Sequence, residues 1–223
     1  MFEKRRAAKH LAAERVQRDG DLERFVKTLV APDGSISESD EARFLAYLGE
    51  QGYADADGSV ASTSLPPDVV RTYSLGLAAA GRFSEATTTL LLKKDEIAYD
   101  EWPAELLKEV TKREFQGGSR GVSVPLGHGI RYRTGAMRGH MVTIGTEWQT
   151  ADAGMLTVTN QRVVYHGGRK TLEFAFTKLA ALNTYTDAID LGVTSRQNTS
   201  SFRLADPEFV AGMIRAALHA SNS

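Results

Sequence analysis

The stretch GMLTVTNQRVVYHGGRKTLEFAF, residues 154–176, contains the pattern that decides the fold. Runs rich in β-branched and aromatic residues alternate with Asn160-Gln161 and Gly167-Gly168, pairs whose residue types tolerate the backbone conformations of tight turns. The pattern predicts three successive antiparallel strands, at residues 155–159, 162–166 and 170–176. Together these strands would form a β-meander.

Shorter strands, separated by turn residues, precede and follow this meander. We expect them at residues 122–126, 130–133, 141–144, 179–185, 189–193 and 202–204. Asp206 and Pro207 then begin a helix with apolar residues at helical spacing from Phe209 to Leu218, and this apolar face needs a surface to pack on. The second half of the chain therefore predicts a small β-barrel or sandwich capped by a C-terminal helix.

The meander also carries a motif. Gly154, Thr159, Asn160 and Arg162 fall in the order G-x-L-x-V-T-N-x-R-V-V-Y, which resembles the signature of GRAM and bacterial PH-like domains. The succession of strands and one final amphipathic helix is similar to the order of elements in the pleckstrin-homology-like superfold. The resemblance implies a PH/GRAM-like domain over residues 94–223.

We expect the four motif residues to serve the fold rather than a ligand. Asparagine accepts the turn conformation, so Asn160 suits the bend between two strands. Arg162 can bond turn carbonyls or a nearby acid such as Glu173. The motif therefore identifies a structural turn.

Residues 1–93 show helical periodicity instead. We expect a helix over 3–30 interrupted at Asp19-Gly20-Asp21, a second helix capped by Ser37 with Asp40 or Ser39, a third that Pro67 begins and Gly81 ends, and a fourth over 83–92. Asp33, Gly34, Ile36 and Glu41 resemble the helix–helix junction of tellurite-resistance TerB-like helical proteins. A further helix is expected over 103–115, begun by Pro103. The prediction is an α+β chain with a helical domain at 1–93 and the β-rich domain at 94–223.

The amino-acid composition excludes several kinds of site and favours an intracellular protein. The 223 residues are 42% hydrophobic and 25% charged and include no cysteine, which excludes disulfides, thiolate metal sites and cysteine nucleophiles. No apolar run approaches the ~20 residues of a membrane-spanning helix, and the N-terminus lacks the apolar region of a secretory signal. We expect a cytoplasmic protein, with a peripheral position at the inner face of the membrane as the alternative.

The net charge of -1 conceals two blocks of opposite sign. Residues 31–70 contain eight acidic residues and one basic residue, a net charge of -7. Residues 112–138 contain six basic residues and one acidic residue, a net charge of +5. Such blocks bear on association rather than on the fold.

The basic block contains the candidate functional surface, at residues 117–140. Its candidate residues for binding an anion or a partner are Arg120, His128, Arg131, Arg133, Arg138 and His140. Basic donors among glycines suit a phosphate, a lipid headgroup, nucleic acid or an acidic protein surface. The alternative is that these arginines bind no external ligand and instead pair with the acidic residues of the helical domain.

Signals for catalysis are lacking. The five histidines are far apart in the sequence, with none of the short spacings typical of metal ligands. The sequence contains no phosphate-binding loop, nucleophile elbow or dinucleotide fingerprint. We therefore expect a protein that is not an enzyme and uses no cofactor or metal.

The function predicted from the sequence is that of an interaction or scaffold protein that binds a protein partner or an anionic surface through its PH-like domain. A peripheral membrane module that binds anionic lipid headgroups is the alternative. An isoelectric point of about 6.5 argues against a nucleic-acid partner.

Overall fold

The computed structural model describes residues 2–53, 60, 64–119, 122–125, 131–134, 137–196 and 198–222. Its helices are α1 (Phe2–Leu29), α2 (Glu38–Glu50), α3 (Pro67–Ala79), the 3-10 turn η2 (Phe176–Lys178) and α4 (Pro207–Ser221). Its strands are β1 (Ala98–Ser119), β2 (Val122–Pro125), β3 (Arg131–Thr134), β4 (Met137–Thr159), β5 (Arg162–Gly167), β6 (Thr171–Ala175), β7 (Leu179–Thr184), β8 (Ala188–Val193) and β9 (Ser200–Arg203). This order confirms the α+β class. The division into domains at residues 93 and 94 stays a prediction.

The N-terminal helices α1, α2 and α3 share one apolar cluster. Its buried members are Leu22, Val26, Leu29, Phe44, Leu48, Tyr53 and Val69. Ser37 begins α2 as predicted, because its hydroxyl accepts a hydrogen bond from the backbone N–H of Asp40 at 3.1 Å. Packing of one face from each helix therefore holds this region together.

The predicted interruption of the first helix at residues 19–21 is wrong. Helix α1 runs through Gly20 without a break, although a glycine inside a helix costs about 1 kcal/mol relative to alanine. Flanking contacts offset that cost, since Leu22 is fully buried and Asp19 accepts a hydrogen bond of 2.5 Å from the hydroxyl of Tyr53. Tertiary packing overrides the local preference here.

Helix α3 ends as predicted. Gly81 adopts a left-handed conformation, with φ +74°, and the backbone N–H of Arg82 returns to the carbonyl of Leu77 at 2.9 Å. A left-handed glycine after the last helical turn supplies partners for the free carbonyls there.

The helix predicted over 83–92 is wrong, because this segment is irregular and runs beside β1. The ring of Phe83 stacks on Tyr99 with 3.9 Å between centroids, and the N–H of Ala86 donates to the carbonyl of Ala98 at 2.8 Å. Three consecutive threonines at 87–89 also disfavour a helix. The aromatic contact and the backbone hydrogen bond therefore hold the segment 83–92 against β1.

Seven strands form one antiparallel sheet in the order β6-β5-β4-β1-β9-β8-β7. The predicted meander is confirmed, since β4 pairs with β5 and β5 pairs with β6. Strands β7, β8 and β9 form a second meander, which joins the first where β9 pairs with β1. The chain thus builds two hairpin-connected halves around β1.

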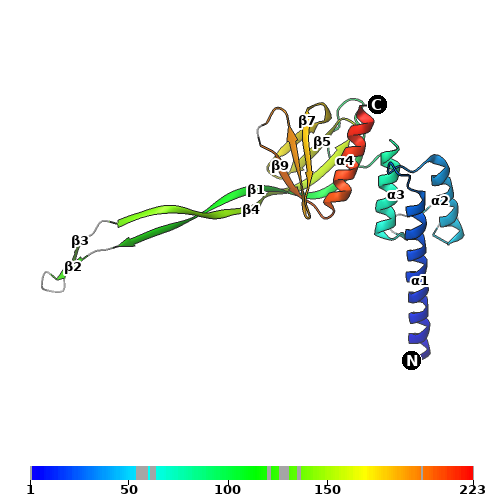
Figure 1. Cartoon of the computed structure of the whole chain (residues 1–223), viewed down its shortest axis with the longest axis horizontal. Helices are drawn as coiled ribbons and strands as arrows, with labels where there is room; N and C mark the ends of the chain where they lie inside the picture. Colours follow the sequence, from blue (N-terminus) through cyan, green and yellow to red (C-terminus); the bar gives the residue numbers. More distant parts are fainter. Residues whose placement is uncertain are drawn as a thin grey trace.

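The two halves of the sheet share a core. The rings of Tyr165 on β5 and Phe174 on β6 lie 5.1 and 5.8 Å from the ring of Phe202 on β9. Helix α4 buries Val210 and Ile214 in the same core. Figure 1 shows α4 between the sheet on one side and α3 on the other. The final helix packs on the sheet as predicted, and it also joins the sheet to the N-terminal helices.

The helix predicted over 103–115 is also wrong, because these residues belong to β1. Residue burial alternates along this strand, with Ala104 and Leu106 buried and the intervening Glu105 partly exposed. Pro103 lacks an N–H, yet it fits in the strand because the ladder between β1 and β9 starts only at Glu105. Strand pairing therefore overrides a helical start signal.

Beyond the sheet, β1 and β4 continue as a two-stranded arm, which we define as the described residues of 108–149. Strand β9 pairs with β1 only at Glu105–Leu107, and β5 pairs with β4 only at Gly154–Val158. The rest of β1 and β4 pair with each other as far as Ser119 and Met137, and the β2–β3 hairpin lies at the far end (Figure 1). The described residues of the segment 117–150 thus project from the sheet.

Candidate functional site

The arm carries four of the six predicted binding residues in its described strands. Arg131 and Arg133 lie in β3, opposite Pro125 and Ser123. Arg138 and His140 begin β4, opposite Gly118 and Gln116. These four residues are thereby brought to the far end of the arm. The other two predicted residues, Arg120 and His128, lie outside the described residues.

This end of the arm is remote from the acidic helices. Figure 1 shows the N-terminal helices on one side of the sheet and the arm extending from the other. Acidic residues of the helical region have nearer partners: Arg82 pairs with Glu41, and Arg43 lies 2.7 Å from Asp40. The described backbone therefore places the basic end of the arm away from the acidic helices.

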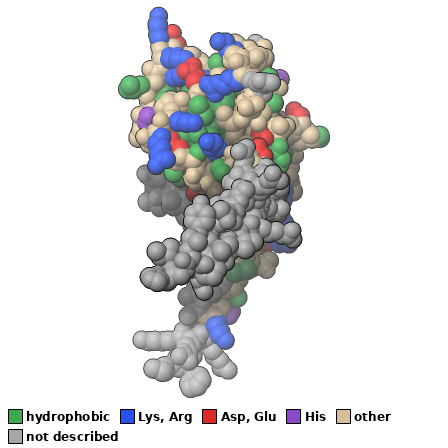
Figure 2. Space-filling view, turned by 90° about the vertical axis from the view of Figure 1, so that its left-hand side faces the viewer, with side chains coloured by type: hydrophobic (Ala, Val, Ile, Leu, Met, Phe, Trp, Pro, Cys, Tyr) green, Lys and Arg blue, Asp and Glu red, His purple; other side chains and the backbone are tan. Residues whose placement is uncertain are grey.

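The arm presents unpaired backbone along both edges in its described length. Lys108, Glu109 and Trp148, near the base of the arm, are exposed. Figure 2, which looks along the arm, shows basic, acidic and hydrophobic side chains interspersed on the part of the molecule behind it. An isolated two-stranded ribbon is at best marginally stable in water, and its free edges can pair with another chain.

The motif residues form a clasp between the β4–β5 turn and the segment that precedes β1. The side-chain oxygen of Asn160 accepts a hydrogen bond of 3.0 Å from the N–H of Ile97, and its amide nitrogen donates to the carbonyl of Asp95 at 3.0 Å. Thr159 donates to Glu96 at 2.9 Å. The turn therefore holds residues 95–97 in place.

A buried ion pair completes the clasp. Arg162 donates two hydrogen bonds to the Glu96 carboxylate, of 2.6 Å from Nε and 2.8 Å from Nη2. Its Nη1 lies 2.7 Å from Glu173, the acid named as its partner from the sequence. The side chain of Glu96 is fully buried and that of Arg162 is 8% exposed. The Glu96–Arg162 pair is the most enclosed ion pair among the described residues.

Electrostatics keep this pair ionised. Burial raises the pKa of the Glu96 carboxyl, but hydrogen bonds from Arg162, the Lys93 backbone and Thr159 outweigh it and leave that pKa below the ordinary value. The Glu96 carboxylate raises the pKa of Arg162, and a hydrogen bond from Lys93 lowers the pKa of Glu173. The donors and acceptors of the clasp are bound to one another, so the clasp ties the β4–β5 turn to the segment before β1.

Gly154, the remaining motif residue, is required by close packing between strands. A Cβ atom at this position would lie 2.2 Å from the carbonyl oxygen of His166 on β5. Contacts that short do not occur between such atoms, so a side chain at Gly154 would force β4 and β5 apart.

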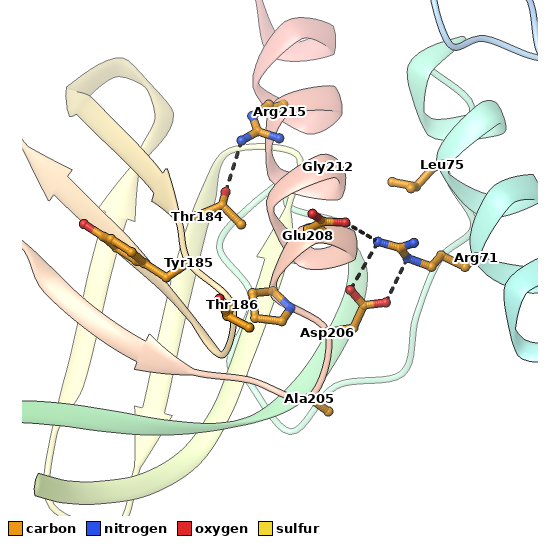
Figure 3. Close-up of a pocket in the computed structure, with 11 residues that line it drawn as sticks. Arg71, Leu75, Thr184, Tyr185, Thr186, Ala205, Asp206, Glu208, Gly212 and Arg215 are labelled. Carbon is orange, nitrogen blue, oxygen red and sulfur yellow. Dashed lines mark hydrogen bonds and ion pairs between the residues drawn. The ribbon is translucent and has the colours of Figure 1, made fainter. Parts of the chain in front are cut away.

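A hollow of about 860 Å³ lies between α3, α4 and the turn that joins β7 to β8 (Figure 3). Nε of Arg71 on α3 lies 2.8 Å from Asp206, and its Nη2 lies 3.1 Å from Glu208. Across the hollow, Arg215 donates to the Thr184 hydroxyl at 3.1 Å. Two cations thus face two anions, so the hollow has little net charge to select an ion.

This hollow contains no arrangement typical of catalysis. Within the described ranges, no three histidine, aspartate or glutamate side chains are grouped to hold a metal ion. The residues that line the hollow include no histidine or cysteine that could serve as a base or nucleophile. Its clearest role is the contact between α3 and α4.

Comparisons with protein-family models, with curated proteins and with solved structures give no match to this chain. In the part of the chain that is described, no helix has the length and apolarity to cross a membrane. The function must therefore be argued from the geometry of this molecule alone.

Two features of the site were not predicted from the sequence. The partner of Arg162 is Glu96, which lies 66 residues away in the sequence. The only sequence signal for this partner is its position in the short acidic stretch before β1. The arm was read as separate short strands and a helix, because its glycines and the proline at 103 are typical of turns and helix starts. No signal in a short window of sequence marked β1 and β4 as two long paired strands.

Proposed function

We propose that the chain is a non-catalytic interaction protein that uses the arm to contact the acidic surface of a partner protein. The observation that carries the proposal is the two-stranded arm, whose free edges and exposed base give it no structural role in the sheet. Its basic residues stand at the end farthest from the acidic helices. A projecting ribbon with concentrated positive charge suits long-range contact with an anionic surface.

The body that carries the arm is proposed to be a PH/GRAM-like domain. Three features support this: seven antiparallel strands in one sheet, a C-terminal helix that packs on it, and the clasp built by the residues of the motif. In this view the sheet and α4 are a rigid base from which the arm extends.

The proposal is tested by reversing charge at the end of the arm. The double variant Arg131→Glu with Arg133→Glu is compared with wild type in affinity capture of partners followed by mass spectrometry, with the melting temperature as a check on folding. The matched control reverses Arg15 and Lys27, two exposed basic residues of α1. We expect the arm variant to lose specific partners that the control keeps, because charge reversal turns attraction into repulsion.

Sedimentation with phosphatidylserine-containing vesicles distinguishes the alternative of a lipid partner. Vesicle binding that falls with rising salt and is lost in the arm variant would assign the surface to anionic lipid headgroups. Capture of the same partners by wild type and arm variant would contradict a role of the basic end in either contact.

A further inference from the structure

A second hollow, of about 310 Å³, lies where the arm leaves the sheet. We call it the aromatic groove and define it by Leu107 on β1, Trp148 on β4, Tyr185 and Asp187 in the β7–β8 turn, Asp190 on β8 and Arg203 on β9. It involves residues different from the basic ones at the far end of the arm. A contact at the groove is therefore independent of the proposed function.

Two large aromatic side chains of the groove are exposed to solvent. Trp148 is 54% exposed and Tyr185 is 52% exposed. Figure 3 shows the ring of Tyr185 extending away from α4, so the ring is not used in the contact between helix and sheet. Exposed aromatic residues that line one hollow are typical of binding surfaces.

The groove also borders a free strand edge. The ladder between β9 and β1 ends with Leu107 opposite Ser201, whereas β1 continues through Lys108 and Glu109. Along the described part of β1 beyond Leu107, no strand occupies the side that β9 has left. An extended peptide can continue such a ladder by main-chain hydrogen bonds, with alternate side chains directed to one face.

The charge of the groove favours a cation. The Asp190 carboxylate accepts a hydrogen bond of 3.2 Å from the Tyr185 hydroxyl, and no basic side chain pairs with Asp190 among the residues that the structure describes. Arg203 is already shared between Glu105 at 3.1 Å and Asp187 at 3.2 Å. The charge of Asp190 also raises the pKa of the Tyr185 hydroxyl. A further acid, Glu109, stands directly opposite Trp148 in the ladder.

We propose that the aromatic groove binds an extended, cationic peptide segment of a partner protein. The segment adds to the free edge of β1 after Leu107 and places an arginine or lysine side chain between Trp148 and Tyr185, within reach of Asp190. Aromatic faces attract a cation, and a planar guanidinium can stack on a ring while it donates to a carboxylate. Arginine is therefore the preferred residue.

The test uses the fluorescence of Trp148 in the full chain. The sequence contains two tryptophans, so a Trp102→Phe background makes Trp148 the only reporter. The probe is a synthetic heptapeptide with arginine at alternate positions among valine and serine, and the control peptide carries citrulline, a neutral isostere, in place of arginine. We expect saturable binding of the arginine peptide and binding of the citrulline peptide about tenfold weaker or less.

Variants locate the binding on the protein. Asp190→Asn and Tyr185→Ala should each weaken binding of the arginine peptide, whereas Asp68→Asn, at an exposed acid on α3, should not. Unchanged melting temperatures establish that the variants fold. A peptide N-methylated at the positions that face β1 should also lose binding, because it cannot donate the main-chain hydrogen bonds.

Three results would overturn the proposal. The first is equal binding of the arginine and citrulline peptides, and the second is an affinity that Asp190→Asn leaves unchanged. The third is a concentration-dependent dimer in sedimentation that Asp190→Asn disrupts, which would assign the groove to a second copy of this chain. None of these readouts involves Arg131 or Arg133, so the proposed function of the arm stands or fails separately.

Discussion

Replacement of Arg162 by methionine is expected to lower the free energy of unfolding by much more than the loss of an exposed ion pair would. The variant removes both donors of the guanidinium to Glu96 and the contact with Glu173. Glu96 then keeps the N–H of Lys93 at 2.7 Å and the hydroxyl of Thr159 at 2.9 Å, but no cation. A buried charge left without its partner costs about 3–5 kcal/mol, whereas exposed pairs contribute about 0–1 kcal/mol.

Urea denaturation followed by circular dichroism and by tryptophan fluorescence measures this loss. The matched control is Arg203→Met, which removes two ion pairs from the same sheet at a side chain that is 41% exposed. The control should shift the midpoint much less. The double variant Glu96→Leu with Arg162→Met should recover part of the loss, because it leaves no buried charge behind.

The result that would refute this reasoning is a free energy of unfolding for Arg162→Met within about 1 kcal/mol of wild type, the range of a solvent-exposed pair. A double variant less stable than Arg162→Met would also contradict it. In that case the hydrogen bonds of Asn160 and Thr159, rather than the buried pair, would hold the segment before β1.

Three further predictions concern pH, packing and the arm. The folded-state pKa values of Glu96 and Glu173 are lowered from 4.5. The stability that these carboxylates contribute is therefore present above pH 4.5 and is lost as pH falls through the folded pKa. Thermal unfolding should show a steeper loss of stability in this acidic range for wild type than for Arg162→Met. Gly154→Ala should lower the free energy of unfolding by about 1–3 kcal/mol in urea titrations, because the Cβ of the alanine would overlap the carbonyl of His166. An unchanged midpoint would contradict the close approach of β4 and β5. Replacing residues 110–147 by Asn-Gly would join the paired Glu109 and Trp148 through a two-residue turn. Calorimetry should then show a nearly unchanged melting temperature. A large drop would mean that the arm supports the sheet.

Local sequence patterns were enough to predict the central meander, the strands that follow it and the final helix, because turn residues separate β-branched and aromatic runs in the strands and apolar residues recur at helical spacing in the helix. Strands β5 and β8 are almost continuously buried, and α4 is amphipathic with Asp206 accepting from the N–H of Phe209 at 3.0 Å. Local signals and tertiary contacts agree in these elements.

The failures fall where local signals and tertiary contacts disagree. Gly20 indicated a break, but the buried Leu22 after it and the hydrogen bond from Tyr53 to Asp19 before it keep α1 continuous. Pro103 and the leucines that follow indicated a helix, but pairing with β4 and β9 holds them in a strand. Long-range strand pairing leaves little trace in a short window of sequence, which is why the arm was not anticipated as one element.

The candidate site was predicted in part. The basic residues of the segment 117–140 could be selected from charge alone, and the backbone places four of them at one end of the arm. The aromatic groove could not be predicted, because Trp148 and Tyr185 come from different meanders and meet only through the sheet order. Neither residue lies in a sequence motif.

The arm also sets a distance. From Lys108 to Ser119 the ribbon advances about 35–40 Å, at about 3.4 Å for each residue of an antiparallel strand. A body held at its far end would stand about one small-domain diameter away from a body held at the aromatic groove. Two such bodies could be tethered to one chain without touching, with the ribbon acting as a spacer whose length is fixed by its number of paired residues.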